Sequence, residues 1–213
     1  MNILNFIEFL ISIKKEDLLG FESHKKMVPF KLNPNTRDFQ PKIDSTESAV
    51  LIILNQISNT NLQIIFTLRS SKLRKHSGQI SFPGGRKDSG ESNIETALRE
   101  TYEEIGIYKD KLNILNEISP LYVPPSNSIV YPVISYSENL QNFKINYDEV
   151  DEIINIDFSH FLNINNLKFS KNLYNNQNEK FPYWDINHTT PLWGATAIIL
   201  QELIDLYNIS ISK

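Results

Sequence analysis

The 213-residue chain contains no cysteine. This absence excludes disulfide frameworks, zinc–thiolate sites, iron–sulfur clusters and cysteine nucleophiles. Basic residues are not in excess either, because 21 lysines and arginines stand against 25 aspartates and glutamates and give a formal net charge of −4. A mildly acidic chain is poorly suited to holding a nucleic-acid backbone over a wide surface. We therefore expect no nucleic-acid partner.

Apolar runs long enough to cross a membrane are also missing. The N-terminal apolar segment Ile3–Ile13 contains Glu8 and is far shorter than the ~20 apolar residues that a membrane-spanning helix needs. Leu4, Ile7 and Leu10 recur at helical spacing, which predicts an amphipathic helix that docks on the rest of the chain. No small-residue cleavage site of a leader is visible. The expectation is a cytoplasmic protein without a membrane partner.

Apolar residues make up 40% of the chain and aromatic residues 11%, which is enough for a packed core. Strand-like runs are predicted at residues 49–57, 61–68, 79–82, 112–121, 130–136, 150–156, 167–174 and 179–187, the last two joined by a turn at 175–178. Helices are predicted at the N-terminus, at 93–105 and from Pro191 to about residue 207. This order predicts the α+β class, a mixed sheet flanked by helices in α/β/α layers.

Two regions are expected along the chain. Residues 1–46 would form the N-terminal helix and a connecting arm at 29–41, and residues 47–213 the main domain. A chain of this length accommodates one domain of ordinary size with such an extension.

Glycine is scarce, and its distribution is uneven. Five of the seven glycines lie in one 29-residue window, namely Gly78, Gly84, Gly85, Gly90 and Gly106. Glycine permits positive φ and close backbone approach, so this window predicts unusual turns. Ordinary turns and a helix cap are the simpler interpretation. The predicted helix at 93–105 has Ser92 and Glu95 at the spacing of a capping box and Gly106 as its C′ residue.

Three carboxylates share one side of that helix. At 3.6 residues per turn, Glu100, Glu103 and Glu104 fall within a sector of ~100°. The apolar stripe beside them is formed by Ile94, Ala97, Leu98, Thr101 and Ile105. Like charges at these spacings destabilise a helix by ~0.2–0.5 kcal/mol per pair, whereas Mg²⁺ prefers oxygen ligands and would remove the repulsion. A divalent-cation site is therefore one interpretation, and a solvated acidic face is the other.

The complete spacing resembles the Nudix box. Gly85 is followed after five residues by Glu91 and after seven more by Arg99-Glu100-Thr101-Tyr102-Glu103-Glu104-Ile105-Gly106-Ile107. Eight of the nine restricted positions in this 23-residue pattern agree, and so constrained a pattern is specific. The departure is Thr101, where the family usually has an aliphatic residue. Thr101 lies on the apolar stripe, so the departure concerns packing and leaves the carboxylates untouched.

The resemblance implies a chemistry and a set of roles. Nudix hydrolases cleave nucleoside diphosphates linked to another moiety by attack of water on phosphorus, with Mg²⁺ or Mn²⁺ held by the glutamates of the box. The implied metal ligands are Glu100, Glu103, Glu104 and the carbonyl of Gly85. Arg99 belongs to the implied catalytic set, and its pairing with Glu91 would orient the loop against the helix. Only bridging cations make the approach of a diphosphate to these carboxylates favourable.

The segment before the box resembles the coenzyme A diphosphatase branch of the family. Its residues are Ile65-Phe66-Thr67-Leu68-Arg69-Ser70, then Arg74, Gly78 and Phe82-Pro83-Gly84-Gly85. Later segments of the same kind are 124–126, 131–133, 149–153 and 192–197, so the resemblance covers residues 47 to 207. It implies hydrolysis of coenzyme A, or its acyl derivatives, to 3′,5′-ADP and (acyl-)4′-phosphopantetheine. Another diphosphate substrate, such as ADP-ribose or a dinucleoside polyphosphate, and a non-catalytic binding module are the alternatives.

Charge placement supports an anionic small-molecule substrate. No acidic residue occurs between Glu47 and Asp88, while six basic residues do: Arg69, Lys72, Arg74, Lys75, Arg86 and Lys87. Coenzyme A carries a 3′-phosphate besides its diphosphate, and arginine binds phosphate oxygens with a bidentate fork. We predict Arg69 and Arg74 as substrate-binding residues and interpret the three lysines as solvated.

Several assignments stay open at this point. Glu149 and Glu152 are both candidates for the general base, and His76 is a weaker candidate for phosphate contact. Tyr183, Trp184 and Trp193 are interpreted as packing residues rather than adenine-stacking ones. The pattern does not separate Mg²⁺ from Mn²⁺ or free from acylated coenzyme A, and it leaves the oligomeric state unknown.

Overall fold

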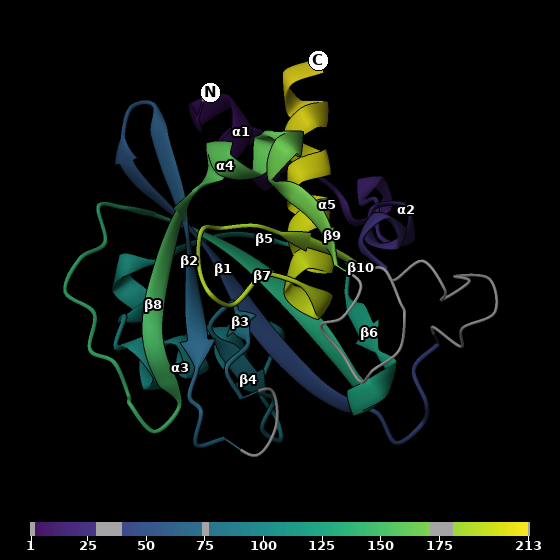
Figure 1. Ribbon diagram of the computed structural model, residues 1–213, viewed down its shortest axis with the longest axis vertical. Coiled ribbons are helices and arrows are strands. Elements are labelled where there is room, and N and C mark those ends of the chain that lie inside the picture. Colours follow the sequence, from purple (N-terminus) through teal and green to yellow (C-terminus); the bar gives the residue numbers. More distant parts are fainter. Residues whose placement is uncertain (1–2, 29–39, 74–76, 171–180, 213) are drawn as a thin grey trace.

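The computed structural model describes residues 3–28, 40–73, 77–170 and 181–212 (Figure 1). Its strands are β1 Thr46–Ser58, β2 Asn61–Arg69, β3 Ile80–Ser81, β4 Gly84–Arg86, β5 Asn113–Glu117, β6 Leu121–Val123, β7 Ser128–Glu138, β8 Val150–Asp157, β9 Leu167–Ser170 and β10 Phe181–Trp184. Its helices are α1 Ile3–Ser12, α2 Phe21–His24, α3 Asn93–Ile105, α4 Phe158–Leu162 and α5 Gly194–Ser212. Short 3₁₀ turns occupy Lys15–Asp17, Lys25–Met27, Lys109–Lys111, Pro124–Ser126 and Ile164–Asn166.

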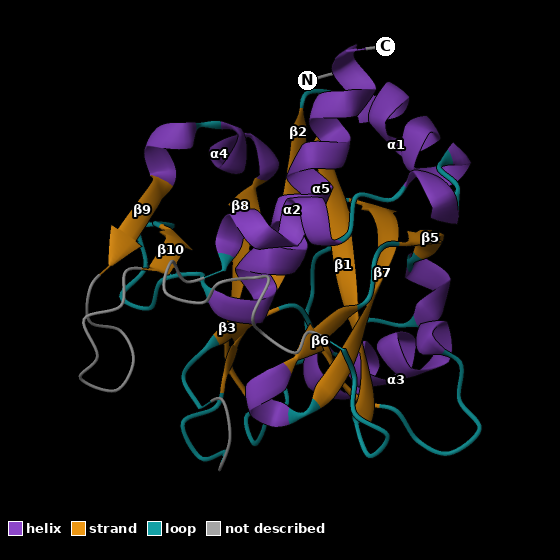
Figure 2. Ribbon diagram, turned by 90° about the vertical axis from the view of Figure 1, so that its right-hand side faces the viewer, coloured by secondary structure: helices purple, strands orange, loops and turns teal. Residues whose placement is uncertain are grey.

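Within the described residues, eight strands form one mixed sheet. The order is β3-β2-β1-β7-β5, with β4 added to β1, β6 to β7 and β8 to β2. β1 and β7 run parallel over their whole paired length, and the other neighbours are antiparallel. Helices α1, α4 and α5 pack on one face and α3 on the other (Figure 2). The predicted α+β class with α/β/α layers is confirmed.

The central strand β1 explains how the two layers arise. Successive strand residues point to opposite faces, and here both faces are apolar. Leu51 and Ile53 enter the smaller core under α3, whereas Ile52 and Leu54 enter the larger core under α5. All four side chains are fully buried. Such a strand reads as a continuous apolar run because neither face meets water.

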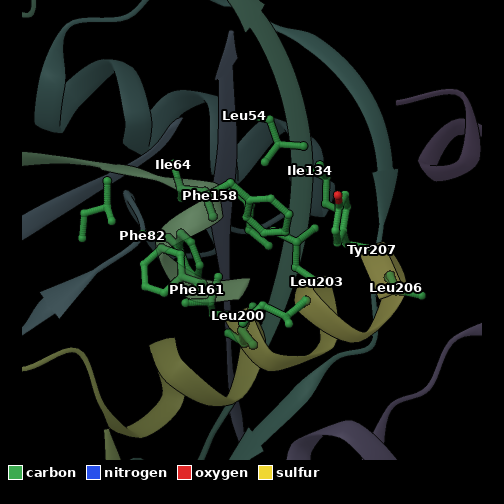
Figure 3. Packing of buried hydrophobic residues seen from close by; sticks show 14 of the residues in the cluster. Leu54, Ile64, Phe82, Ile134, Phe158, Phe161, Leu200, Leu203, Leu206 and Tyr207 are labelled. Carbon is green, nitrogen blue, oxygen red and sulfur yellow. The ribbon is translucent and has the colours of Figure 1, made fainter. Parts of the chain in front are cut away.

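Aromatic side chains pack between the helices of the larger core (Figure 3). The ring of Phe158 in α4 stacks on Phe6 of α1 at 5.6 Å between centroids and meets Tyr207 of α5 edge-on at 5.3 Å. Phe6 and Phe158 are fully buried. The predicted docking of an amphipathic N-terminal helix is therefore confirmed. The division of the chain at residue 46 stays a prediction.

Two predicted elements differ from the structure. The final helix begins at Gly194 rather than at Pro191, because the backbone of Leu192 forms two hydrogen bonds with Trp184 that hold it in an extended conformation. The predicted strand at 112–121 is two strands, β5 and β6, which pair with different stretches of β7. The break coincides with Pro120 and Pro132, neither of which has an N–H to donate to a ladder.

Other predictions hold or lie elsewhere. β9 and β10 pair antiparallel as predicted, while the turn at 175–178 and most of the arm at 29–41 fall outside the described residues. None of the helices in the described part of the chain combines the length and apolar character needed to span a bilayer.

Candidate active site

The helix that carries the predicted carboxylates is fixed at both ends. The Ser92 side chain accepts a hydrogen bond from the Glu95 N–H while the Glu95 carboxylate accepts one from the Ser92 N–H, and Gly106 ends the helix in the left-handed region at φ 71°. The predicted capping box and C′ glycine are thus confirmed. Thr101 is fully buried, and its hydroxyl donates to the Ala97 carbonyl at 2.7 Å. A polar residue is accommodated on the apolar stripe because its hydroxyl is satisfied within the helix.

Two of the carboxylates face inward from α3. Glu100 and Glu104 are four residues apart and therefore share one face of the helix. The Glu104 side chain is 2% exposed and that of Glu100 14%. The Gly84 N–H donates to Glu104 Oε2 at 3.2 Å, which connects the helix to β4. Glu104 is therefore more deeply buried than a residue at the edge of an apolar stripe would be.

The adjacent glycines of β4 allow this close approach. β4 pairs antiparallel with β1, Gly84 opposite Val50 and Gly85 opposite Ala49. A Cβ on Gly84 would lie 2.3 Å from the Ala49 carbonyl oxygen, and a Cβ on Gly85 would lie 2.2 Å from Glu100 Oε2. A side chain at Gly84 would meet the backbone of β1, whereas one at Gly85 would have to displace the Glu100 carboxylate. The glycine pair thus serves the packing of β4 against both β1 and the carboxylate of Glu100.

A third carboxylate comes from a distant part of the chain. Oxygens of Glu100, Glu104 and Glu149 all lie within 4.8 Å of one another. Glu149 directly precedes β8, and its carbonyl accepts a hydrogen bond from the Ser70 N–H at 2.8 Å. The Asn146 N–H donates to the Glu104 carbonyl at 2.9 Å, so the loop before β8 docks on the end of α3. These elements meet in the lower part of Figure 1.

The electrostatics of the cluster are unfavourable to three bare negative charges. Burial raises the pKa of Glu104 to about 8, although Arg69 and the Gly84 N–H act in the opposite direction. Burial also raises the pKa of Glu100, with Arg99 opposing it. Desolvation and neighbouring like charge both disfavour the ionised form. A cation among these oxygens would relieve both effects.

Arg99 connects the outer parts of the site. Its guanidinium donates to both oxygens of Glu91, at 2.7 and 3.0 Å, and to Glu100 Oε1 at 2.8 Å. It also contacts Glu103 at 3.1 Å and the Arg86 carbonyl at 3.0 Å. The Arg99 contact is the main reason why the pKa of Glu91 falls to about 2. The ion pair implied by the family resemblance is present, and it ties the glycine-containing loop to α3.

The structure separates the predicted ligands into two groups. Glu100 and Glu104 lie in the cluster, with Gly85 against Glu100, whereas Glu103 is about half exposed and paired with Arg99 outside it. Glu149, weighed in the sequence only as a base, takes the third position. The signal available for Glu149 was its location at a strand start. Its distance in sequence from the box concealed the contact.

The predicted basic patch is partly neutralised in the fold. Lys72 pairs with Asp148 at 3.2 Å and is 64% exposed, as expected of a solvated lysine. Lys87 pairs with Glu47 at 3.2 Å and is only 22% exposed, so it is less solvated than predicted. Arg69 at the end of β2 approaches Glu104 at 3.5 Å. The other predicted substrate residue, Arg74, lies outside the described residues, as do Lys75 and His76.

The remaining candidates lie outside the carboxylate cluster. Glu152 is exposed and faces His188 at 3.4 Å. Trp184 is buried in the larger core, and the ring of Trp193 packs against Phe181 at 5.5 Å, in line with their interpretation as packing residues.

Comparisons with known proteins agree with the motif. The sequence model of the NUDIX domain matches residues 46–181. The Caenorhabditis elegans protein named Nudix hydrolase 3 is 31% identical over 184 residues, 78% of this chain and 75% of the relative. The Mus musculus protein named mitochondrial coenzyme A diphosphatase NUDT8 is 33% identical over 150 residues, 67% of this chain and 70% of the relative. Among solved structures, the M. smegmatis Nudix hydrolase RenU shares the fold, with a TM-score of 0.56 and 14% identity over 77% of this chain and 86% of that chain.

Proposed function

This chain belongs to the Nudix hydrolase family, and we propose that it hydrolyses the diphosphate bond of coenzyme A or its acyl derivatives. The products would be 3′,5′-ADP and 4′-phosphopantetheine or its acylated form. The observation that carries the proposal is the cluster of three carboxylates beside Arg69, at the end of the segment that resembles the coenzyme A diphosphatase branch. The relative named as a coenzyme A diphosphatase supports the choice of substrate.

The cluster fits a divalent cation, Mg²⁺ or Mn²⁺. Glu100, Glu104 and Glu149 bring carboxylate oxygens within 4.8 Å of one another, and carboxylates are the ligands that these hard cations take. We assign the cation to Glu100 and Glu104, with the carbonyl of Gly85 and the carboxylate of Glu103 as further ligands at the outer edge, and Glu149 as the carboxylate beside it. A bound cation would draw negative charge from the diphosphate and acidify the attacking water.

The chain's own groups supply the proton acceptor. In the hydrolysis, the water oxygen bonds to one phosphorus, the bond from that phosphorus to the bridging oxygen breaks, and the water gives up a proton. Glu100 and Glu104 each have an arginine partner. Among the described residues, no such cation is paired with Glu149. We therefore propose that Glu149 accepts the proton of the attacking water. Arg99 forms an ion pair with Glu100 and would keep this metal ligand oriented.

The arginines before the box would bind the substrate's phosphates. Arg69 lies beside the cluster, at the end of β2, where a diphosphate held by the carboxylate-bound cation would also lie. Its planar guanidinium suits phosphate oxygens. We propose Arg69 for the diphosphate and Arg74 for the additional phosphate that distinguishes coenzyme A.

A product assay on coenzyme A with Mg²⁺ or Mn²⁺ tests the reaction. Glu104→Gln keeps the side-chain size but removes the charge, so we expect hydrolysis to be lost; retained activity would overturn the metal assignment. Glu149→Gln should lower the rate at least about 100-fold, the lower range for a general base. Glu152→Gln, three residues along and exposed, is the matched control and should stay within about twofold of the unaltered chain.

The alternatives give different results in the same assay. If another nucleoside diphosphate derivative is the substrate, Arg74→Ala will slow all substrates equally. Under our proposal it slows coenzyme A selectively over ADP-ribose. Failure to hydrolyse any diphosphate in a panel, with either cation, would instead indicate a non-catalytic binding module.

A further inference from the structure

Arg69 has an unusual environment for a substrate-binding residue. Its Nη1 lies 3.5 Å from Glu104 Oε1, and the Glu104 side chain is almost completely buried. The other Glu104 oxygen accepts the Gly84 N–H. Among the described residues, Arg69 is therefore the basic side chain in contact with the most buried carboxylate of the cluster.

The guanidinium is incompletely satisfied in that position. The Arg69 Nε is buried and has no hydrogen-bond partner among the described residues. Its contact with Glu104 is longer than the 2.7–2.9 Å of a good charge-assisted hydrogen bond. A buried donor left without an acceptor carries a free-energy cost. An arriving anion that accepts from Nε would therefore stabilise a different position of this side chain.

A cation held by the same carboxylates is a competitor of Arg69. Both groups are positive, both are attracted to Glu104, and burial leaves little water to screen their mutual repulsion. Glu100, the second cluster member on α3, already has Arg99 as a partner. Among the described residues, Arg69 is thus the cation that competes with a divalent cation for Glu104, through a longer contact than the one Arg99 makes with Glu100.

We propose that Arg69 is the resident counter-cation of Glu104, displaced by the divalent cation and thereby released to bind the phosphate oxygens of the substrate. This inference rests on the proposed function, since it requires the metal site. It predicts an order of events, with the cation binding first and the anion second. It also makes the two ligands cooperative, because the cation frees the group that the anion needs.

Mn²⁺ binding to the full-length chain without nucleotide tests the competition. The free cation is counted by electron paramagnetic resonance, so the readout does not depend on turnover. We expect Arg69→Gln to bind Mn²⁺ at least about tenfold more tightly, equivalent to about 1.4 kcal/mol, and Arg69→Lys, which keeps the charge, to stay within about threefold of the unaltered chain. Arg86→Gln is the matched control and should leave the affinity within about twofold. Arg86 lines a neighbouring pocket with Lys87 and Glu91, and it takes part in no ion pair among the described residues.

The direction of the change in Mn²⁺ affinity shows whether Arg69 competes with the cation or supports Glu104. If Arg69 only supports Glu104, its removal weakens or does not change Mn²⁺ binding, and the counter-cation proposal is wrong while the metal site stands. If the unaltered chain and Glu104→Gln both fail to bind Mn²⁺, the proposed function fails together with this inference. Equal tightening in Arg86→Gln would reduce the effect to general charge and also overturn the proposal.

A second measurement uses the unaltered chain, in case Arg69→Gln does not fold. The Arg69 Nε–H resonance is identified in ¹⁵N spectra by its loss in Arg69→Lys. We expect its exchange with solvent to accelerate as Mg²⁺ saturates the site, because the released guanidinium leaves its buried position. Unchanged or slower exchange at saturating Mg²⁺ would contradict displacement.

Discussion

Gly85→Ala is the sharpest test of how the site is built. The added Cβ would lie 2.2 Å from Glu100 Oε2 and 2.4 Å from its carboxyl carbon, whereas real Cβ atoms essentially never come closer than 3.0 Å. The carboxylate must therefore retreat by about 0.8 Å, close to the 1 Å misplacement that costs about 100-fold in rate. Mg²⁺ demands near-ideal octahedral geometry, so a carboxylate oxygen displaced by this distance would no longer lie in a ligand position. We expect coenzyme A hydrolysis to fall about 100-fold, or about 2.7 kcal/mol of activation free energy.

Stability should respond differently from activity. The backbone of Gly85 lies outside the left-handed region, so alanine adds no backbone strain there, and the flexible end of Glu100 is what moves. Gly194→Ala gives the opposite combination. Gly194 has φ +61° with open space around it, so alanine there should cost about 1–2 kcal/mol of stability with little loss of activity.

Rates with saturating Mg²⁺ and urea unfolding of both variants provide the comparison. Full activity in Gly85→Ala would refute the reasoning, because it would mean that the position of the Glu100 carboxylate is irrelevant to the reaction. A loss of activity explained by unfolding would refute it as well. Only an inactive but folded protein is consistent with the displacement of a ligand.

Three further changes have defined outcomes. Phe158→Ala should lower the free energy of unfolding in urea by about 3–5 kcal/mol, since its ring packs between α1 and α5; Phe158→Leu should cost less. Arg99→Lys keeps the charge but loses the fork on Glu91, so hydrolysis should drop at least about tenfold, and an unchanged rate would contradict its orienting role. Burial of Glu202 raises its pKa, but hydrogen bonds from His24, Ser119 and Gly20 outweigh this and lower it below its ordinary value of 4.5. The stability that ionised Glu202 provides is complete above pH 4.5 and disappears as pH falls through its lower pKa in the folded state. The free energy of unfolding measured in urea should therefore decrease more steeply below pH 4.5 in the unaltered chain than in Glu202→Gln.

The parts of the site that the sequence predicts are those encoded locally. The capping box of α3, its C′ glycine and the shared helix side of Glu100 and Glu104 all follow from spacings within a single helix. Such features depend on the helical period and on one turn, and neither needs knowledge of the sheet. The ion pair between Arg99 and Glu91 is implied by the resemblance to the Nudix box and not by spacing.

Ion-pair partners that are distant in the sequence could not be predicted from local spacing. Lys72 and Lys87 are neutralised by Asp148 and Glu47, which are 76 and 40 residues away in the chain. A stretch without acidic residues is therefore not an uncompensated surface once strands from elsewhere lie beside it. The predicted start of α5 was wrong for a different reason, because the nearby residue Trp184 of β10 pairs with Leu192 and holds it in an extended conformation.

Glu149 shows how the fold completes a local motif. Along β2 and β8 the pairing places Leu68 opposite Glu152 but Arg69 opposite Val150, so Asp151 is an extra residue, and a bulge of this kind re-aims the side chains next to it. The bulge is held by the Asp151 carboxylate, which accepts the Ser71 N–H at 2.9 Å. Since side chains alternate along a strand, a regular ladder would turn the residue before Val150 toward the opposite face. The direction of the Glu149 side chain relative to Arg69 therefore depends on this irregularity, which no sequence period encodes.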